Sequence, residues 1–135
     1  MVGGDHDIIA CNAAFYRAFS VRDHAAMAGL WSSSAPVSCI HPGWDMLVGH
    51  EAVMKSWRDV MNDPHSPAVE CRNACEFVEG DFGYVLCHEV FDEGVLIATN
   101  IFRREDGAWR MVHHQAGPPA MALSDPSATV GGTVH

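Results

Sequence analysis

Basic residues are scarce in this sequence, which has 8 Lys and Arg against 17 Asp and Glu in 135 residues and a formal net charge of −9. Lys55 is its single lysine, and Arg103 and Arg104 are its one adjacent basic pair. A negative potential repels phosphate backbones and anionic lipid head groups. We therefore expect neither nucleic acid nor a membrane as a partner.

Long hydrophobic runs are also missing, and no segment approaches the length that a membrane span requires. The opening residues MVGGDHDII lack the basic segment and the apolar stretch of a secretory signal. The five cysteines are an odd number spread singly through apolar segments. Such thiols are typical of small buried hydrophobes in a reducing compartment, so we expect a cytoplasmic protein.

Familiar catalytic motifs are absent as well. The sequence has no phosphate-binding loop, no dinucleotide fingerprint, no nucleophile elbow and no Cys–His nucleophile signature. Cys71 and Cys75 do not have the two-residue spacing of a zinc knuckle, and the histidines show no helical spacing. We predict neither a metal site nor a cofactor.

The composition is that of an ordinary folded domain, with 48% apolar and 19% charged residues. A chain of this length suits one domain with a single core. We expect that domain to span residues 5–118. The segment 119–135 contains prolines and a glycine pair, and we expect an arm or a disordered end there.

A helical period governs the first half of the chain. Apolar residues recur at helical spacing from Ile8 to Phe19, which predicts a helix over 7–21. Asp23 can cap a second, shorter helix, and Gly49 precedes a third that ends at 62–64. Between them, residues 37–41 are predicted to form a short strand.

From residue 68 the period changes to two. The run AVECRNACEF predicts a strand with one buried face, interrupted at Asn73. Its apolar positions are Val69, Cys71, Cys75 and Phe77. Short turns then separate predicted strands at 82–91, 95–104 and 108–115, and such turns join antiparallel neighbours. We therefore predict an α+β fold, with three N-terminal helices packed on a curved four-stranded antiparallel meander.

Helices lying on a curved sheet tend to enclose an apolar cleft, and bulky side chains are available to line one. Trp44 lies in the loop after His41, where a large side chain is expected to cover a cavity mouth. The predicted pocket residues are Phe15, Tyr16, Phe19, Trp31, Trp44, Met54, Trp57 and Phe102. We expect the pocket to bind a small, mostly apolar organic molecule.

A few polar residues interrupt the apolar strands. His41 ends the first strand, while Glu89 and Asn100 fall inside the central strands. Polar residues in such places either face solvent or are buried with a partner. Only one of His113 and His114 can share the inner face, because successive side chains in a strand alternate.

The order of the elements, the run CIHPGWDMLVGHEAVMKSW at 39–57 and the ending NIFRREDGAWRMVHHQAGP at 100–118 resemble the SnoaL-like branch of the nuclear transport factor 2-like superfamily. The closing strand also resembles the association domain of calcium/calmodulin-dependent protein kinase II. The resemblance implies a cone-shaped α+β fold with a pocket. It also implies a homodimer formed through the outer sheet face. The resemblance to the kinase association domain leaves a larger ring of subunits as an alternative. The residues predicted to supply part of that face are Val85, Ile97, Ile101 and Met111.

Within this superfamily, the resemblance to ketosteroid isomerases implies specific roles. His41 falls where those enzymes have their general-base Asp, and Asn100 falls where they have a protonated Asp. Phe15 takes the position of their oxyanion Tyr, with Tyr16 one helical step away. By this comparison His41, near its ordinary pKa at the pocket rim, would accept a proton and Asn100 would donate a hydrogen bond. In the same comparison Glu89, Val112 and His114 face the pocket. Glu89 or His114 would be auxiliary polar groups.

Three classes of function remain open from the sequence. The leading interpretation is a non-catalytic protein that binds a small molecule. The alternatives are an acid/base isomerase or lyase that uses His41 and Asn100, and a non-catalytic oligomerisation module.

Overall fold

The structure is a computed structural model that describes residues 6–119. The predicted C-terminal arm, apart from its first residue, lies outside the described residues. The helices are α1 (His6–Val21), α2 (His24–Leu30) and α3 (His50–Asn62). The strands are β1 (Ser38–Ile40), β2 (Leu47–Val48), β3 (Glu70–Glu79), β4 (Phe82–Phe91), β5 (Gly94–Glu105) and β6 (Ala108–Gly117).

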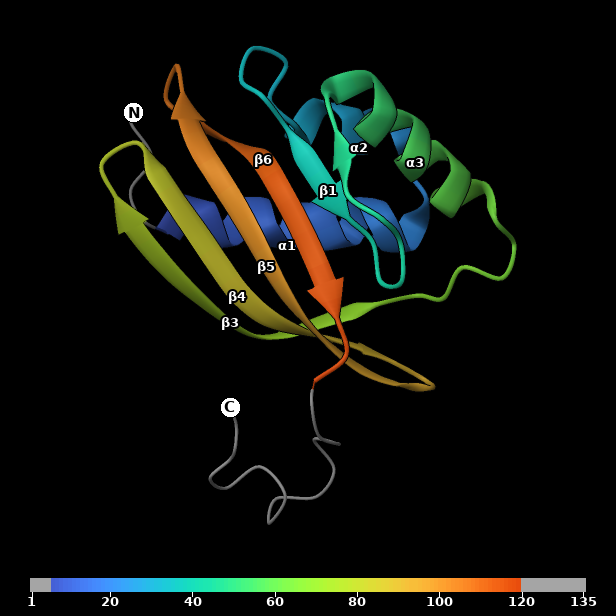
Figure 1. Cartoon of the computed structure of the whole chain (residues 1–135). Helices are drawn as coiled ribbons and strands as arrows, with labels where there is room; N and C mark the ends of the chain where they lie inside the picture. The colour runs from blue at the N-terminus through green and yellow to red at the C-terminus, as the bar shows by residue number, and fades with distance from the viewer. Residues whose placement is uncertain (1–5, 120–135) are drawn as a thin grey trace.

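The six strands form one curved sheet in the order β2-β1-β6-β5-β4-β3 (Figure 1). In Figure 1, α1 crosses behind the long strands, whereas α2 and α3 lie near β1. The three helices pack against this sheet, which is antiparallel except between β1 and β6. The α+β class predicted from the sequence is confirmed.

Local signals account for the helix starts. The Asp23 carboxylate accepts a hydrogen bond from the backbone N–H of Ala26 at 3.0 Å and caps α2. Gly49 precedes α3 with a φ of +100°, a conformation that favours glycine. These two residues place the helices where the sequence predicted them.

The sheet has two more strands than the predicted meander. β1 runs parallel to β6, with Cys39 opposite His114, and β2 adds an antiparallel edge. A parallel pair joins segments far apart in the chain, so no local turn signal indicates it. Because His41 follows β1 directly, this pairing brings it to the side of β6.

A bulge in β3 overturns the prediction that its apolar residues before and after Asn73 share one buried face. The pairing shifts between Arg72 and Cys75, and Asn73 has a φ of 60°. An extra residue reverses the alternation of side chains beyond it. Cys71 is therefore half-buried on the inner side, whereas Cys75 and Phe77 are exposed on the outer side.

A second bulge lies in β6. Ile101 pairs with His113 and Phe102 pairs with Met111, so Val112 is the extra residue. Met111 is fully buried for this reason, and its predicted place on the outer face is wrong. Val112 is partly buried and packs against the core.

The alternation of side chains along β4 and β5 decides the positions of the other residues predicted for the outer face. Val85 is fully buried, because it shares the inner face of β4 with Glu89, so its predicted outer position is wrong too. Ile97 and Ile101 alternate with buried residues of β5 and lie on the outer face as predicted.

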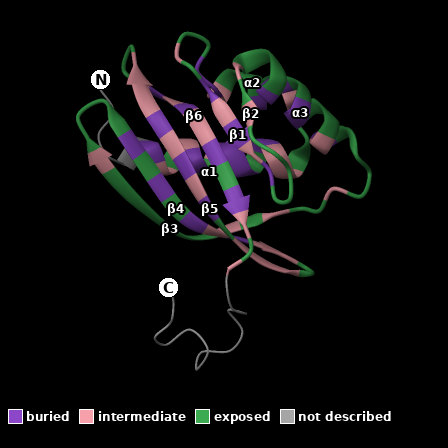
Figure 2. Cartoon of the chain, viewed as in Figure 1, coloured by how far each residue is buried: buried purple, intermediate pink, exposed green. Residues whose placement is uncertain are grey.

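Burial alternates along β4, β5 and β6, whereas β3 is largely exposed (Figure 2). The core lies between the helices and the sheet, and it is closely packed at the end of the sheet that holds the β3–β4 turn. There Gly83 lies so close to α1 that a Cβ at this position would be 2.6 Å from Cδ1 of Ile8. Phe102, Trp109 and Met111 complete the packing at this end.

None of the helices within residues 6–119 combines the length and the apolar character needed to cross a bilayer.

Candidate functional site

A cavity of about 270 Å³ opens at the other end of the cone. Its wall comes from the end of α1, the loop after β1, α3, the segment before β3 and the strands β4 to β6. The lining residues are Phe19, His41, Pro42, Trp44, Trp57, Val60, Ser66, Pro67, Val69, Glu89, Phe91, Leu96 and His114. Since most of these side chains are apolar, the cavity suits a small, mostly apolar molecule.

Three ionisable side chains reach this apolar wall from three different elements: His41 after β1, Glu89 from β4 and His114 from β6. All three are buried, with exposed fractions of 4%, 3% and 2%. Burial in an apolar wall disfavours the charged form of each group.

Glu89 is held by a hydrogen bond from α1. The hydroxyl of Tyr16 donates to Oε2 of Glu89 at 2.7 Å, and Nε2 of His114 lies 3.8 Å from the same oxygen. Burial raises the pKa of Glu89 above its usual range, and the hydrogen bond from Tyr16 opposes part of that rise. The other carboxyl oxygen, Oε1, has no hydrogen-bond partner among the described residues.

His114 is oriented by Asn100. Nδ1 of His114 lies 2.6 Å from Oδ1 of Asn100, so Nδ1 carries the proton and Nε2 faces Glu89 with a lone pair. Complete burial lowers the pKa of His114 to about 3, with smaller contributions from the nearby charges of His41 and His113. The imidazole is therefore neutral at pH 7.

His41 lies between two tryptophans, with ring centroids 4.8 Å from Trp44 and 4.7 Å from Trp57. Its Nε2 donates to Oγ of Ser56 at 2.9 Å, because the Ser56 hydroxyl itself donates to the carbonyl of Val53 at 2.7 Å. This tautomer leaves Nδ1 of His41 as a proton acceptor.

Burial lowers the pKa of His41 to about 4. The sequence-based expectation of an imidazole near its ordinary pKa is therefore wrong. The expectation assumed a side chain at the rim, whereas the two neighbouring tryptophans exclude water from the ring.

Asn100 lies beneath the cavity wall and is fully buried. Its Nδ2 donates to Oδ1 of Asn12 at 2.8 Å and to the hydroxyl of Tyr16 at 3.2 Å. Both amide hydrogens are thus in use, and no N–H of Asn100 is free for a ligand. The contacts of Asn100 orient His114 and Tyr16 instead.

The eight predicted pocket residues separate into two groups. Phe19, Trp44 and Trp57 line the cavity, and Trp44 is 45% exposed at its mouth. Phe15, Tyr16, Trp31, Met54 and Phe102 are buried but are not among the lining residues.

Position along the elements explains this division. Phe102 shares the inner face of β5 with Leu96, but six residues of strand separate them by about 20 Å. Phe15 packs edge-on against Trp57, with ring centroids 5.3 Å apart, and so supports the wall from behind. Met54 lies on another side of α3, in a separate groove.

The sequence reasoning missed Asn12 and Ser56. Asn12 lies four residues after Ile8 and four before Tyr16, so it falls on the buried stripe of α1. Ser56 is buried on α3 beside Trp57. Both could have been found from the sequence, because each is a polar residue on the apolar stripe of a predicted helix.

The described residues contain no group of three His, Cys, Asp or Glu side chains with the geometry of a metal site.

Comparison with known proteins adds two sequence matches. A family model described as a SnoaL-like domain matches residues 8–121. F-box protein SKIP8 from Arabidopsis thaliana is 29% identical over 125 residues, which cover 91% of this chain and 53% of that protein. The chain thus spans about half the length of the curated relative that it matches.

Solved structures share the fold. A candidate dehydratase of the nuclear transport factor 2-like family from Streptomyces avermitilis has a TM-score of 0.79 and 27% identity, and the match covers 87% of this chain and 96% of that chain. A candidate association domain of calcium/calmodulin-dependent protein kinase type II from Thiobacillus denitrificans has a TM-score of 0.74 and 30% identity, and that match covers 82% and 94%. The chain belongs to the SnoaL-like domain family of the nuclear transport factor 2-like superfamily.

Proposed function

We propose that this protein binds a small, mostly apolar carbonyl compound in the cavity and catalyses its isomerisation or dehydration by acid/base chemistry. The observation that carries the proposal is the buried carboxyl of Glu89 at an apolar wall, where the nearby His114 is neutral and supplies no positive charge. Such a carboxyl costs folding free energy, and a raised pKa in a cavity is typical of a catalytic acid or base.

Glu89 acts first as a base. Its carboxylate takes the proton from a carbon next to the carbonyl, and the C–H electron pair moves through the new C=C bond onto the carbonyl oxygen, which gives an enolate. In a substrate with a β,γ double bond, Glu89 returns the proton to the γ carbon and the double bond moves into conjugation with the carbonyl. In a β-hydroxy substrate, the hydroxyl group leaves as water with the proton that Glu89 took, and the enolate electron pair forms the C=C bond of the unsaturated carbonyl product.

The surrounding residues position and stabilise these species. Tyr16 occupies Oε2 of Glu89, which leaves Oε1 for the substrate. The indole N–H of Trp57 is buried without a hydrogen-bond partner among the described residues, and Trp57 lines the cavity. We propose that this indole N–H donates a hydrogen bond to the enolate oxygen, because the amide hydrogens of Asn100 are already in use.

The second candidate function is binding without chemistry. The low pKa of His41 and the full engagement of Asn100 favour it, because both residues are the counterparts of catalytic groups in ketosteroid isomerases. The similarity to a candidate dehydratase, at 27% identity, supports the catalytic proposal instead.

Exchange of α-protons separates the two candidates. The protein is incubated in D2O with a panel of small cyclic ketones, and deuterium uptake is followed by NMR. We expect Glu89→Gln to slow uptake by about 100-fold or more, the usual contribution of a general base. Glu70→Gln, at an exposed position of β3, is the matched control. Equal rates in wild type and Glu89→Gln, with unchanged ketone affinity, would leave binding as the function.

We also propose that the chain forms a homodimer through the outer face of the sheet. Phe77 and Tyr84 stack there with ring centroids 4.8 Å apart, beside Leu86 and Ile97, and each of the four is at least 37% exposed. An apolar patch of this kind on a monomer would favour aggregation. Cys39, Cys71, Cys75 and Cys87 carry reduced thiols, which supports the reducing cytoplasm expected from the sequence.

Light scattering at low protein concentration tests the dimer. We expect twice the chain mass of 14.7 kDa for wild type and a monomer for Ile97→Glu. Asp92→Glu, an exposed change on the β4–β5 turn, is the control. A larger ring would favour the oligomerisation module, and a wild-type monomer would refute the proposal.

A further inference from the structure

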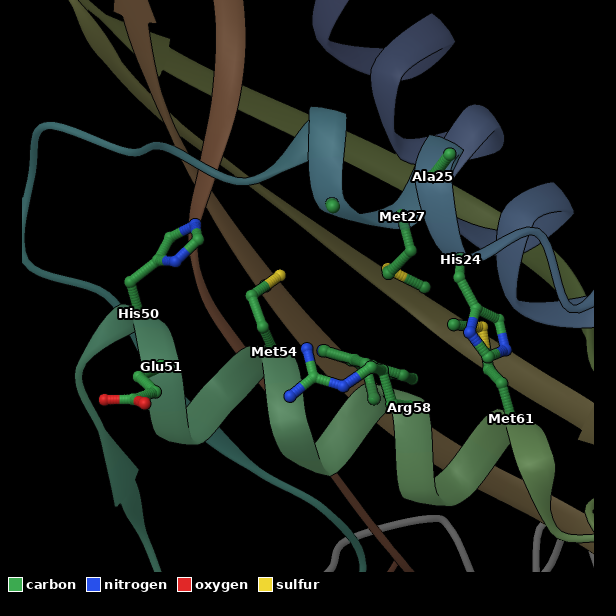
Figure 3. A pocket seen from close by; sticks show the side chains of 10 residues that line it. His24, Ala25, Met27, His50, Glu51, Met54, Arg58 and Met61 are labelled. Atoms are coloured by element: carbon green, nitrogen blue, oxygen red, sulfur yellow. The ribbon is translucent and has the colours of Figure 1, made fainter.

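A second hollow lies outside the cone, between α2 and α3, and has a volume of about 600 Å³ (Figure 3). Of the groups to which we assign a catalytic role, neither Glu89 nor His114 lines this groove, whereas Trp57 does. Trp57 lines both hollows and so forms a shared wall.

The floor of this groove consists of methionines from both helices. Met27 comes from α2, whereas Met54 and Met61 come from α3, two turns apart on one face. Figure 3 shows these side chains between the two helices. Methionine is flexible and polarisable, so a floor of this kind adapts to an apolar chain or ring.

The rim carries an unpaired cation. Arg58 lies on the groove side of α3, and its guanidinium makes no hydrogen bond or ion pair with the side chains that the structure describes, those of residues 8–119. His24 and His50 stand at the rim near the starts of α2 and α3, and Glu51 is the one acidic residue among the lining side chains.

We propose that this groove is a second ligand site, which binds a small apolar monocarboxylate with its carboxylate on Arg58 and its hydrocarbon part on the methionines. The planar guanidinium matches the two oxygens of a carboxylate in a bidentate contact. One arginine beside Glu51, on a negatively charged protein, favours a single negative charge over the double charge of a phosphate monoester.

Octanoate is a suitable probe, with 1-octanol as its uncharged counterpart. Affinities are measured by calorimetry, and the site is located by NMR of protein labelled at the methionine methyl groups. We expect octanoate to shift the signals of Met27, Met54 and Met61. The signals of Met46, in the loop at the mouth of the inner cavity, and Met111, in the core, should stay in place.

Arg58→Gln tests the carboxylate contact, with Arg17→Gln on the exposed side of α1 as the matched control. We expect Arg58→Gln to weaken octanoate binding by about tenfold and to leave octanol binding unchanged. Unchanged octanol affinity also shows that the variant is folded. Equal octanoate affinity in the two variants, or octanoate shifts that miss the three groove methyls, would overturn the proposal.

The outcome is independent of the catalytic proposal. Glu89→Gln should bind octanoate in the groove like wild type, and Arg58→Gln should exchange ketone α-protons at the wild-type rate. Loss of octanoate binding in Glu89→Gln would place the carboxylate in the inner cavity and so contradict the groove site.

Discussion

The hydroxyl of Tyr16 and the carboxyl of Glu89 form a buried hydrogen bond of 2.7 Å between α1 and β4. This bond lowers the pKa of Glu89 against the larger effect of burial, which raises it. The helix therefore tunes an ionisable group that belongs to the sheet.

Tyr16→Phe should raise the pKa of Glu89 further, because the variant removes the one hydrogen bond that favours the carboxylate. The change is measured by NMR titration of the Glu89 side-chain carbon, and the basic form should appear at higher pH in any pH–rate profile. Tyr84→Phe is the matched control, since the chain has two tyrosines and Tyr84 lies on the outer face. An unchanged titration in Tyr16→Phe would contradict this account.

Glu89→Gln should stabilise the protein relative to wild type at alkaline pH, although it slows catalysis. Because burial raises the pKa of Glu89 in the folded state, its contribution to stability is present below its unfolded-state pKa and is lost as the pH rises through its folded-state pKa. The amide introduced by Glu89→Gln does not ionise, so the variant does not lose stability in this way. Urea unfolding at pH 5 and pH 9 should show a smaller decline for Glu89→Gln than for wild type, and Glu70→Gln should follow wild type.

His41→Gln should reduce the acid sensitivity of the fold. The pKa of His41 falls from 6.5 to about 4, so its contribution to stability is present above pH 6.5 and is lost as the pH falls towards 4. The effect is on the order of 3 kcal/mol across that window. Urea unfolding at both ends of the window measures it. His65→Gln, at a histidine whose side chain is 93% exposed, is the control variant for the loss of a histidine.

Asn73→Val should destabilise the protein by about 1–2 kcal/mol, because a β-branched residue is strained at the positive φ of the β3 bulge. Asn73→Gly should cost less, since glycine accepts this conformation. Urea unfolding of the two variants compares them directly. A Val variant as stable as the Gly variant would show that the bulge rearranges without strain.

Local sequence determined most of the elements. Asp23 and Gly49 indicated in the sequence where α2 and α3 begin. The turn residues on either side predicted a strand at 82–91, and β4 has these bounds. These signals act between residues close in the chain, and the conformations they require are properties of the residues themselves. The position of Trp44 in a loop at the cavity mouth could be predicted for the same reason.

Tertiary structure alone decided which predicted pocket residues reach the cavity and how its ionisable groups are charged. The bulges at Asn73 and Val112 reversed side-chain parity, which no alternation pattern reveals, and the parallel pairing of β1 with β6 brought His41 towards His114. Burial then lowered the pKa of both histidines and raised that of Glu89. A pKa depends on the solvent and the dipoles that surround a group in space, and those come from residues distant in the sequence.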